Sequence, residues 1–187
     1  PCLKGLVVSL AIDDPYWPSL ACANDPRIQR ADGGSERSGS VLNALLQLNA
    51  LGASDEDWVL VHDAARPNLS RDDLDKLLAE LADDPVGGLL AVPARDTLKR
   101  VDRHGRVVDT IDRSLIWQAY TPQMFRLGAL HRALADSLVA DALITDEASA
   151  MEWSGQAPRL VEGRSDNIKV TRPEDLEWLK LRWANRR

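Results

Sequence analysis

The sequence predicts an α/β fold built on a doubly wound, mostly parallel sheet. Short apolar runs alternate with segments of helical periodicity over most of the chain, as in parallel sheets with crossover helices. The runs at residues 58–61 and 87–93 are apolar throughout, which is typical of strands covered on both faces. With 187 residues, 44% of them hydrophobic, the chain is expected to form one domain, 1–187.

Each element follows from local residue chemistry. Strands are expected at residues 5–11, 28–31, 58–61, 87–93, 159–162 and 167–170, and those at 5–11, 58–61 and 87–93 are expected to be buried. Helices are expected at residues 17–22, 41–48, 72–81, 125–138 and 145–153, and a terminal helix begins within residues 171–175. The expected N-caps are Ser70, Thr145 and Thr171, with Pro173 in the first turn and Glu174 reaching back.

Residues 94–113 break the alternation of strands and helices. Residues 94–101 and 106–113 alternate polar and apolar side chains around a turn at residues 102–105, which predicts a β-hairpin. A lone two-stranded ribbon is only marginally stable in water. We therefore expect an arm at about residues 95–120 that lies against a second copy of the protein, making a homodimer.

Composition excludes several classes of protein. The net charge of −6 argues against a broad nucleic-acid-binding face. No apolar run is long enough to span a membrane, and no secretory signal opens the chain. Cys2 and Cys22 are too few for a disulfide framework and lack metal-site spacing. We expect a cytoplasmic protein without nucleic-acid or membrane partners.

The stretch at residues 58–67 carries the strongest functional signal. Asp63 and Arg66 follow a predicted strand, and ligands of open α/β sheets bind outside the carboxyl ends of the strands. A carboxylate and a planar cation at that edge suit phosphate chemistry. The alternative is a turn Asp that caps a helix and an Arg that is simply solvated.

A second candidate is the Gly/Ser-rich stretch at residues 32–40. A loop of this kind that opens a helix leaves backbone N–H groups free for an anion or a base edge. It is not a dinucleotide fingerprint and has no P-loop lysine. An ordinary loop with a Ser cap remains the alternative.

Five motifs in register resemble the 2-C-methyl-D-erythritol 4-phosphate cytidylyltransferase family. They lie at residues 62–67, 96–100, 121–123, 145–149 and 166–171. The resemblance implies transfer of a cytidylyl group from CTP to methylerythritol phosphate, with Mg²⁺ and release of pyrophosphate. It also implies a dimer whose arm completes the partner's active site.

The resemblance assigns roles residue by residue. Asp63 and Lys169 are the catalytic candidates, and Asp63 is also the metal ligand. The nucleotide-binding candidates are Gly34, Ser35, Ser40, Asp63 and Ala64. The candidates for binding the substrate phosphate and polyol are Arg66, Thr97, Arg113, Thr145 and Lys169, with Thr97 and Arg113 supplied by the partner.

The sequence departs from the family pattern at its start. The family opens with a strand and a Gly-rich loop bearing two cations, and this sequence has neither. We therefore expect residues before Pro1 in the natural protein. Two alternatives remain open: a cytidylyltransferase for another polyol phosphate, such as ribitol 5-phosphate, and a non-catalytic nucleotide-binding dimer.

Overall fold

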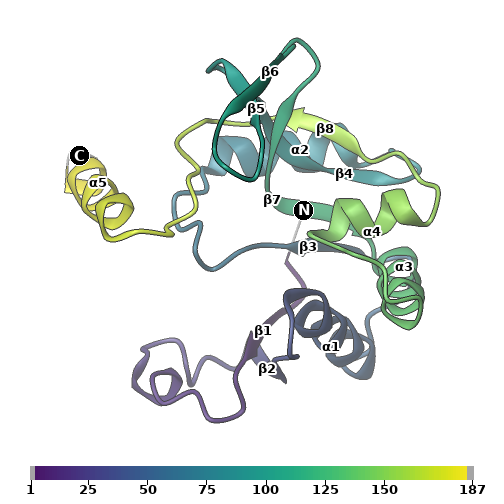
Figure 1. Ribbon diagram of the computed structural model, residues 1–187. Helices are drawn as coiled ribbons and strands as arrows, with labels where there is room; N and C mark the ends of the chain where they lie inside the picture. Colours follow the sequence, from purple (N-terminus) through teal and green to yellow (C-terminus); the bar gives the residue numbers. More distant parts are fainter. Residues whose placement is uncertain (1–2, 185–187) are drawn as a thin grey trace. The chain divides into compact units, whose positions relative to one another are not determined.

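The computed structural model describes residues 3–184 and has the α/β architecture that the sequence predicts (Figure 1). The chain divides into two compact units, which are described separately. The first unit comprises residues 3–61 and 125–158, and the second comprises residues 62–124 and 159–184.

The first unit contains a parallel pair of strands covered by a helix. β1 (Leu6–Leu10) runs parallel to β2 (Ile28–Asp32), with Leu6 opposite Ile28. α1 (Arg37–Ala50) packs on both strands and on α3 (Leu127–Val139), which in turn contacts α4 (Glu147–Trp153). A 3₁₀ turn, η1 (Trp17–Ser19), and the strand β3 (Trp58–Val61) complete this unit.

The apolar core of the first unit lies among its helices. Its side chains are almost fully buried, and they come mainly from α1, α3 and α4: Leu45, Leu127, Leu130, Leu134, Ala150 and Met151. Helical spacing of apolar residues places them on one face of each helix. The apolar residues whose spacing predicts each helix therefore also form the face through which the helices pack together.

The second unit is a sheet covered by one helix. β7 (Trp117–Arg126, whose last two residues belong to the first unit), β4 (Gly87–Pro93) and β8 (Arg159–Glu162) are neighbours in that order, and β4 and β8 are parallel. α2 (Arg71–Leu81) packs on β4 and β8. Glycine is required at position 88, because a Cβ there would collide with the carbonyl oxygen of Arg159 in β8.

The hairpin arm is present but shorter than expected. β5 (Leu98–Val101) and β6 (Val107–Ile111) are antiparallel, with Leu98 opposite Ile111. The predicted turn at residues 102–105 is confirmed. Its ends are joined by the hydrogen bond from the Asp102 N–H to the Arg106 carbonyl, and Gly105 adopts φ +76°.

Most predicted elements are confirmed, but the strands differ from the prediction in three ways. The strand β7 was not predicted. Residues 167–170 form no strand. The Asn167 N–H donates to the Arg164 carbonyl oxygen at 3.3 Å and the Val170 N–H donates to that of Ala65 at 2.7 Å, so their hydrogen bonds go to loops and not to a strand ladder. The strands at residues 6–10 and 58–61 exist but are mostly half-buried, whereas β4 is buried along almost its whole length.

Several helix starts also differ from the prediction. Ser70 caps α2 as predicted, accepting from the Asp73 N–H. The cap of α4 is Asp146 rather than Thr145, and it forms a reciprocal capping box with Ser149. The terminal helix α5 (Pro173–Ala184) does begin with proline.

The carboxylate that reaches back at the start of α5 is that of Asp175, not Glu174. It accepts hydrogen bonds from the N–H groups of Thr171 and Arg172, both at 2.9 Å. The predicted short helix at residues 17–22 is the three-residue η1. α1 begins at Arg37, so the last residues of the predicted Gly/Ser loop are helical.

None of the helices in residues 3–184 combines the length and the apolarity that a membrane span requires. Cys22 is a free, exposed thiol, and Cys2 lies outside the described residues.

Candidate functional site

A carboxylate and two cations meet in the second unit, directly after β3. The Asp63 Oδ2 atom lies 3.0 Å from Lys169 Nζ and 3.9 Å from Arg66 Nε. The Asp63 side chain is 14% exposed and that of Lys169 is 45% exposed, so the ammonium can reach solvent while the carboxylate is largely enclosed. Asp63 and Arg66 are close in sequence, and Lys169 lies more than 100 residues further along the chain. All three were predicted to act on the same substrates.

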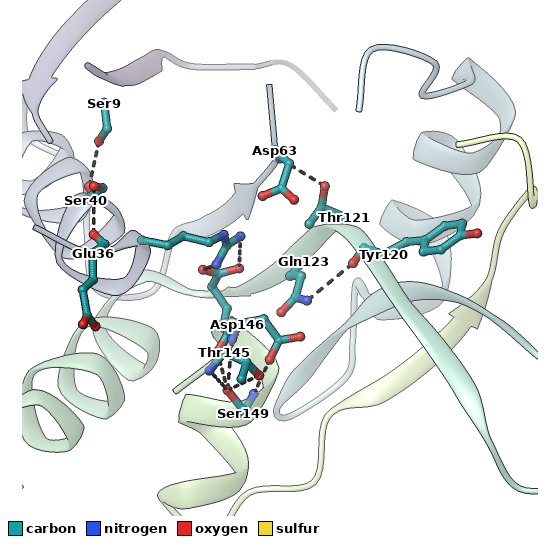
Figure 2. Close-up of polar contacts among 12 residues, drawn as sticks. Ser9, Glu36, Ser40, Asp63, Tyr120, Thr121, Gln123, Thr145, Asp146 and Ser149 are labelled. Atoms are coloured by element: carbon teal, nitrogen blue, oxygen red, sulfur yellow. Dashed lines mark hydrogen bonds and ion pairs between the residues drawn. The ribbon is translucent and has the colours of Figure 1, made fainter. Parts of the chain in front are cut away.

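The backbone of Asp63 is fixed by a chain of hydrogen bonds. Its N–H donates to Thr121 Oγ1 at 3.1 Å, as Figure 2 shows, and Thr121 Oγ1 lies 2.8 Å from His62 Nδ1. His62 Nε2 lies 3.0 Å from the Arg66 carbonyl oxygen, which can only accept, so the ring donates there. His62 Nδ1 then accepts from the Thr121 hydroxyl.

The lowered pKa of His62 favours the neutral ring that its two hydrogen bonds require. Partial burial of the ring lowers the pKa of His62, and the hydrogen bond to Arg66 opposes this effect only in part. A neutral imidazole donates through one nitrogen and accepts through the other, which is the pattern that this chain of bonds needs. The turn from His62 to Arg66 is therefore held at both ends, and the Arg66 N–H closes it by donating to the Asp63 carbonyl at 2.9 Å.

Arg66 is buried within the protein. Its Nη1 donates to the carbonyl oxygen of Asn167 at 2.8 Å, its Nη2 donates to that of Ala119 at 3.4 Å, and its guanidinium lies 4.4 Å from the centre of the Tyr120 ring. These contacts give it a role in holding the loops together. Its predicted contact with the substrate stays a prediction.

Asn167 holds the segment that carries Lys169. The Asn167 side chain is almost fully buried and donates from Nδ2 to the Thr121 carbonyl oxygen at 2.9 Å. Together with the bond from Val170 to Ala65, this contact fixes the segment on both sides of Lys169. A residue that is buried, polar and bonded in this way orients its neighbours.

The sequence did not single out Asn167 or Thr121 as individual functional residues. The signal was present, because both lie inside motifs that carry the family resemblance, at residues 166–171 and 121–123.

The predicted nucleotide-binding loop lies in the first unit. Ser40 Oγ donates to the Glu36 carbonyl oxygen at 3.0 Å (Figure 2), and it accepts from the Gly34 N–H at 2.9 Å. The Ser9 hydroxyl donates to the Ser40 carbonyl oxygen at 2.7 Å. Gly34 and Ser40 are thus brought together, and Ser35 is exposed at the tip of this loop.

α1 begins at the end of this loop. Glu36, its N-cap, makes no side-chain capping bond. The first N–H groups of a helix have no partner within the helix, and they favour an anion or an acceptor edge of a ligand. This arrangement supports the interpretation of residues 34–40 as a binding loop, although its last residues belong to the helix.

The remaining candidates are exposed residues of one or the other unit. Thr145 is exposed in the first unit, where its N–H donates to Ser149 Oγ at 3.0 Å. Ala64 is exposed beside Asp63 in the second unit. Thr97 and Arg113 are exposed at the base of the arm, where Thr97 directly precedes Leu98 and Arg113 lies two residues after Ile111, the partner of Leu98 in the hairpin.

The predicted metal site can be judged from its donors. The described residues contain no group of three or more His, Cys, Asp or Glu side chains arranged to hold a metal ion. Mg²⁺ does not need such a cage, since it commonly binds one or two carboxylates together with substrate phosphates and water. Asp63 alone therefore fits a magnesium ion that arrives with a triphosphate.

A mostly parallel α/β sheet with a carboxylate and cations at a strand end defines a class of protein that handles phosphate-bearing ligands. The comparisons identify the family. Residues 2–181 match the model of 2-C-methyl-D-erythritol 4-phosphate cytidylyltransferase, and the chain belongs to this family.

Similar proteins carry the same name. The chain is 92% identical over 187 residues to 2-C-methyl-D-erythritol 4-phosphate cytidylyltransferase of Pseudomonas fluorescens strain SBW25, covering all of this chain and 80% of the relative. It is 80% identical, with the same coverage, to the enzyme so named in Pseudomonas putida strain KT2440.

Solved structures agree with the family assignment. A crystal structure of 4-diphosphocytidyl-2C-methyl-D-erythritol synthase superposes with a TM-score of 0.84 at 40% identity, covering 94% of this chain and 80% of the other. The cytidylyltransferase of Francisella tularensis gives a TM-score of 0.83 at 38% identity, covering 97% and 81%.

Proposed function

We propose that the protein transfers a cytidylyl group from CTP to 2-C-methyl-D-erythritol 4-phosphate and releases pyrophosphate, a step in making isoprenoid precursors. Membership of the family supports this function, and the named relatives share it. The observation that carries it in this chain is the contact between the Asp63 carboxylate and Lys169, at 3.0 Å. The alternatives, another polyol phosphate or a non-catalytic dimer, are not favoured by the relatives.

The chemistry is an in-line displacement at phosphorus. An oxygen of the methylerythritol phosphate attacks the α-phosphorus of CTP, the bond from that phosphorus to the bridging oxygen breaks, and pyrophosphate leaves with the electron pair. Both reactants are anions, so the protein must supply positive charge and fixed positions more than covalent chemistry. Magnesium, when bound, neutralises charge on the triphosphate oxygens.

Each predicted residue has a role in this proposal. Asp63 holds the magnesium ion, and Lys169 turns from Asp63 to the phosphates. Gly34, Ser35 and Ser40 bind the cytosine and ribose through short side chains and backbone groups, and Ala64 lies close to the nucleotide. Arg66, Lys169 and Thr145 bind methylerythritol phosphate, and Thr97 and Arg113 of a partner subunit bind its phosphate group.

The proposal includes assembly and location. The arm is exposed and has few apolar contacts of its own, which supports a homodimer formed through it. We place the protein in the cytoplasm, with no nucleic-acid or membrane partner.

The test is a product assay on the protein expressed from its complete gene. It is incubated with CTP, Mg²⁺ and methylerythritol phosphate, and the pyrophosphate and the cytidylylated product are measured by coupled assay and mass spectrometry. Parallel reactions contain ribitol 5-phosphate or no acceptor. Product with methylerythritol phosphate supports the proposal, and product only with ribitol 5-phosphate, or with neither, overturns it.

A further inference from the structure

A partly buried ion pair joins two helix starts within the first unit. Arg37, the first residue of α1, and Glu147, the first residue of α4, form a bidentate contact: Nη1 to Oε1 at 2.5 Å and Nη2 to Oε2 at 3.0 Å. Glu147 is fully buried and the Arg37 side chain is 34% exposed. The planar fork of arginine matches a carboxylate with two parallel bonds, which fixes orientation as well as distance.

Each partner is adjacent to a segment that the proposed function uses. Arg37 follows the loop that contains Gly34 and Ser35, and it precedes Ser40 by one helical turn. Glu147 stands two residues after Thr145, in the helix that Asp146 caps (Figure 2). The side chains of Arg37 and Thr145 also line the same small hollow.

A contribution to the stability of the fold does not by itself explain this ion pair. Burial raises the pKa of the Glu147 carboxyl, and the bonds to Arg37 oppose that rise, so the charge is held at a desolvation cost. Buried ion pairs can often be replaced by apolar residues of similar size without loss of stability, although removing one partner is damaging. What apolar residues cannot supply is the directional alignment of the two backbones.

We propose that Arg37 and Glu147 are positioning residues that hold the cytidine-binding loop in register with Thr145 of the methylerythritol phosphate pocket. This inference rests on the proposed function for the identity of the two ligands. It adds that the loop and Thr145 are mechanically coupled through one bidentate contact. Loosening that contact should therefore weaken the binding of both substrates together.

Two conservative variants test the coupling. Arg37→Lys keeps the charge and loses the fork, and Glu147→Gln keeps the shape and loses the charge. In each, KM for CTP and KM for methylerythritol phosphate are expected to rise about 10-fold, with a smaller change in kcat, because misplaced binding groups act mainly before the chemical step. The matched control is Arg132→Lys in the exposed pair of Arg132 and Asp55, which should leave both constants unchanged.

A double variant separates positioning from stability. Arg37→Met with Glu147→Leu fills the same space without a buried charge, so its melting temperature should stay within a few degrees of the parent's. Both KM values should still be raised. Parental KM values in the double variant, or single variants that lower the melting temperature and leave both KM values unchanged, would overturn the proposal.

Hydrogen exchange distinguishes this inference from the proposed function. Arg37→Lys should speed amide exchange at residues 144–149, and Glu147→Gln should speed it at residues 34–40, whether or not the protein turns over these substrates. If the parent makes no product but exchange at the distant segment rises, the proposed function fails and the coupling stands. If exchange rises only beside the altered residue, the coupling is wrong.

Discussion

At the scale of single residues, Asp63 is held by its backbone as well as by its side chain. Its N–H and its carbonyl oxygen are both hydrogen-bonded, to Thr121 and to the Arg66 N–H, and its carboxylate contacts Lys169. A carboxylate that is placed before its ligand arrives loses little conformational freedom on binding. Changes at Asp63 and at its supports should therefore affect activity in different ways.

We expect Asp63→Asn to abolish the proposed cytidylyl transfer, with a loss of at least about 100-fold in kcat/KM, because an amide cannot neutralise a metal ion. The fold should survive, since the partner Lys169 is 45% exposed and can be solvated. Pyrophosphate release and circular dichroism measure the two effects. Near-parental turnover in a folded Asp63→Asn protein would remove the metal role from this residue.

A substitution at Thr121 tests the hydrogen bonds that hold Asp63, rather than the carboxylate of Asp63 itself. Thr121→Val keeps the shape but leaves the Asp63 N–H and His62 Nδ1 without their shared partner, which should lower the free energy of unfolding by about 1–3 kcal/mol. It should also raise the Mg²⁺ concentration needed for half-maximal rate. Thr121→Ser retains the hydroxyl and should recover most of the magnesium dependence. Equal effects of the two variants in a magnesium titration would count against the hydrogen-bond explanation.

Gly34 is needed because of close backbone approach. A Cβ at this position would lie 2.8 Å from the Gly39 carbonyl carbon and 2.9 Å from the Ser40 nitrogen, and neither backbone atom can move aside easily. Gly34→Ala should therefore displace the loop and raise KM for CTP more than KM for methylerythritol phosphate. Gly52→Ala, at φ +91° with open space around it, is the control for glycine loss without this collision. Steady-state kinetics with each substrate varied separately decides the point.

The sequence predicted the charged residues better than their supports. Asp63 and Arg66 stand out because they follow a strand, and Lys169 because it lies in a family motif. Thr121 and Asn167 have no charge, and their function is to bond particular backbone atoms of distant segments. Such contacts depend on tertiary placement, which spacing along the chain does not contain.

At the scale of elements, the sequence predicted the helices and strands that depend on residues close together in the chain. β4 was identified by its apolar run, and α2 by its periodicity and by the Ser70 cap. β7 was missed because it contains a proline, Pro122, near its middle and because its apolar and polar residues do not alternate. Residues 167–170 have strand-like composition, yet tertiary bonds from Asn167 and to Ala65 take the place of a ladder.

The terminal helix α5 supplies a prediction at this scale. The Asp166 carboxylate binds Arg164 at 2.7 Å and also pairs with Arg182 of α5, while Trp183 donates to Asn68 at 3.1 Å. The hydrogen bond from Arg164, and then the charges of Arg164 and Arg182, lower the pKa of Asp166 below its ordinary value of 3.8. This stabilisation is complete above about pH 5 and is lost as the pH falls through the lowered pKa.

Acid should therefore release α5 before the rest of the second unit unfolds. Hydrogen exchange at residues 173–184 should speed up as the pH falls below about 4, after correction for intrinsic rates. Asp166→Asn should show the faster exchange already at neutral pH, by an amount worth at most about 1 kcal/mol, because water screens the half-exposed Arg164. Glu174→Gln alters an exposed ion pair and should behave like the parent. If Asp166→Asn also showed the exchange profile of the parent, Asp166 would not hold α5 in place.

At the scale of the whole molecule, the arm exposes much of its apolar surface within one chain. Val101, Val107 and Val108 are more than half exposed, and Leu115 at its base is 87% exposed. Two strands with this much apolar surface in water are expected to bind another surface. The predicted partner is a second copy of the chain, which would bring Thr97 and Arg113 to the neighbouring subunit's substrate.

Mixed dimers test whether the site is shared in this way. Arg113→Ala should raise KM for methylerythritol phosphate with little effect on KM for CTP, and Lys169→Ala should lower turnover. When the two variant proteins are unfolded, mixed and refolded together, each mixed dimer contains one site with both Lys169 and Arg113 intact, because the two residues of a site come from different subunits. Activity should then exceed that of either variant alone, in proportion to the fraction of mixed dimers measured by native mass spectrometry. If Arg113 instead served its own subunit, every site in every mixed dimer would carry one altered residue, and mixing would recover nothing.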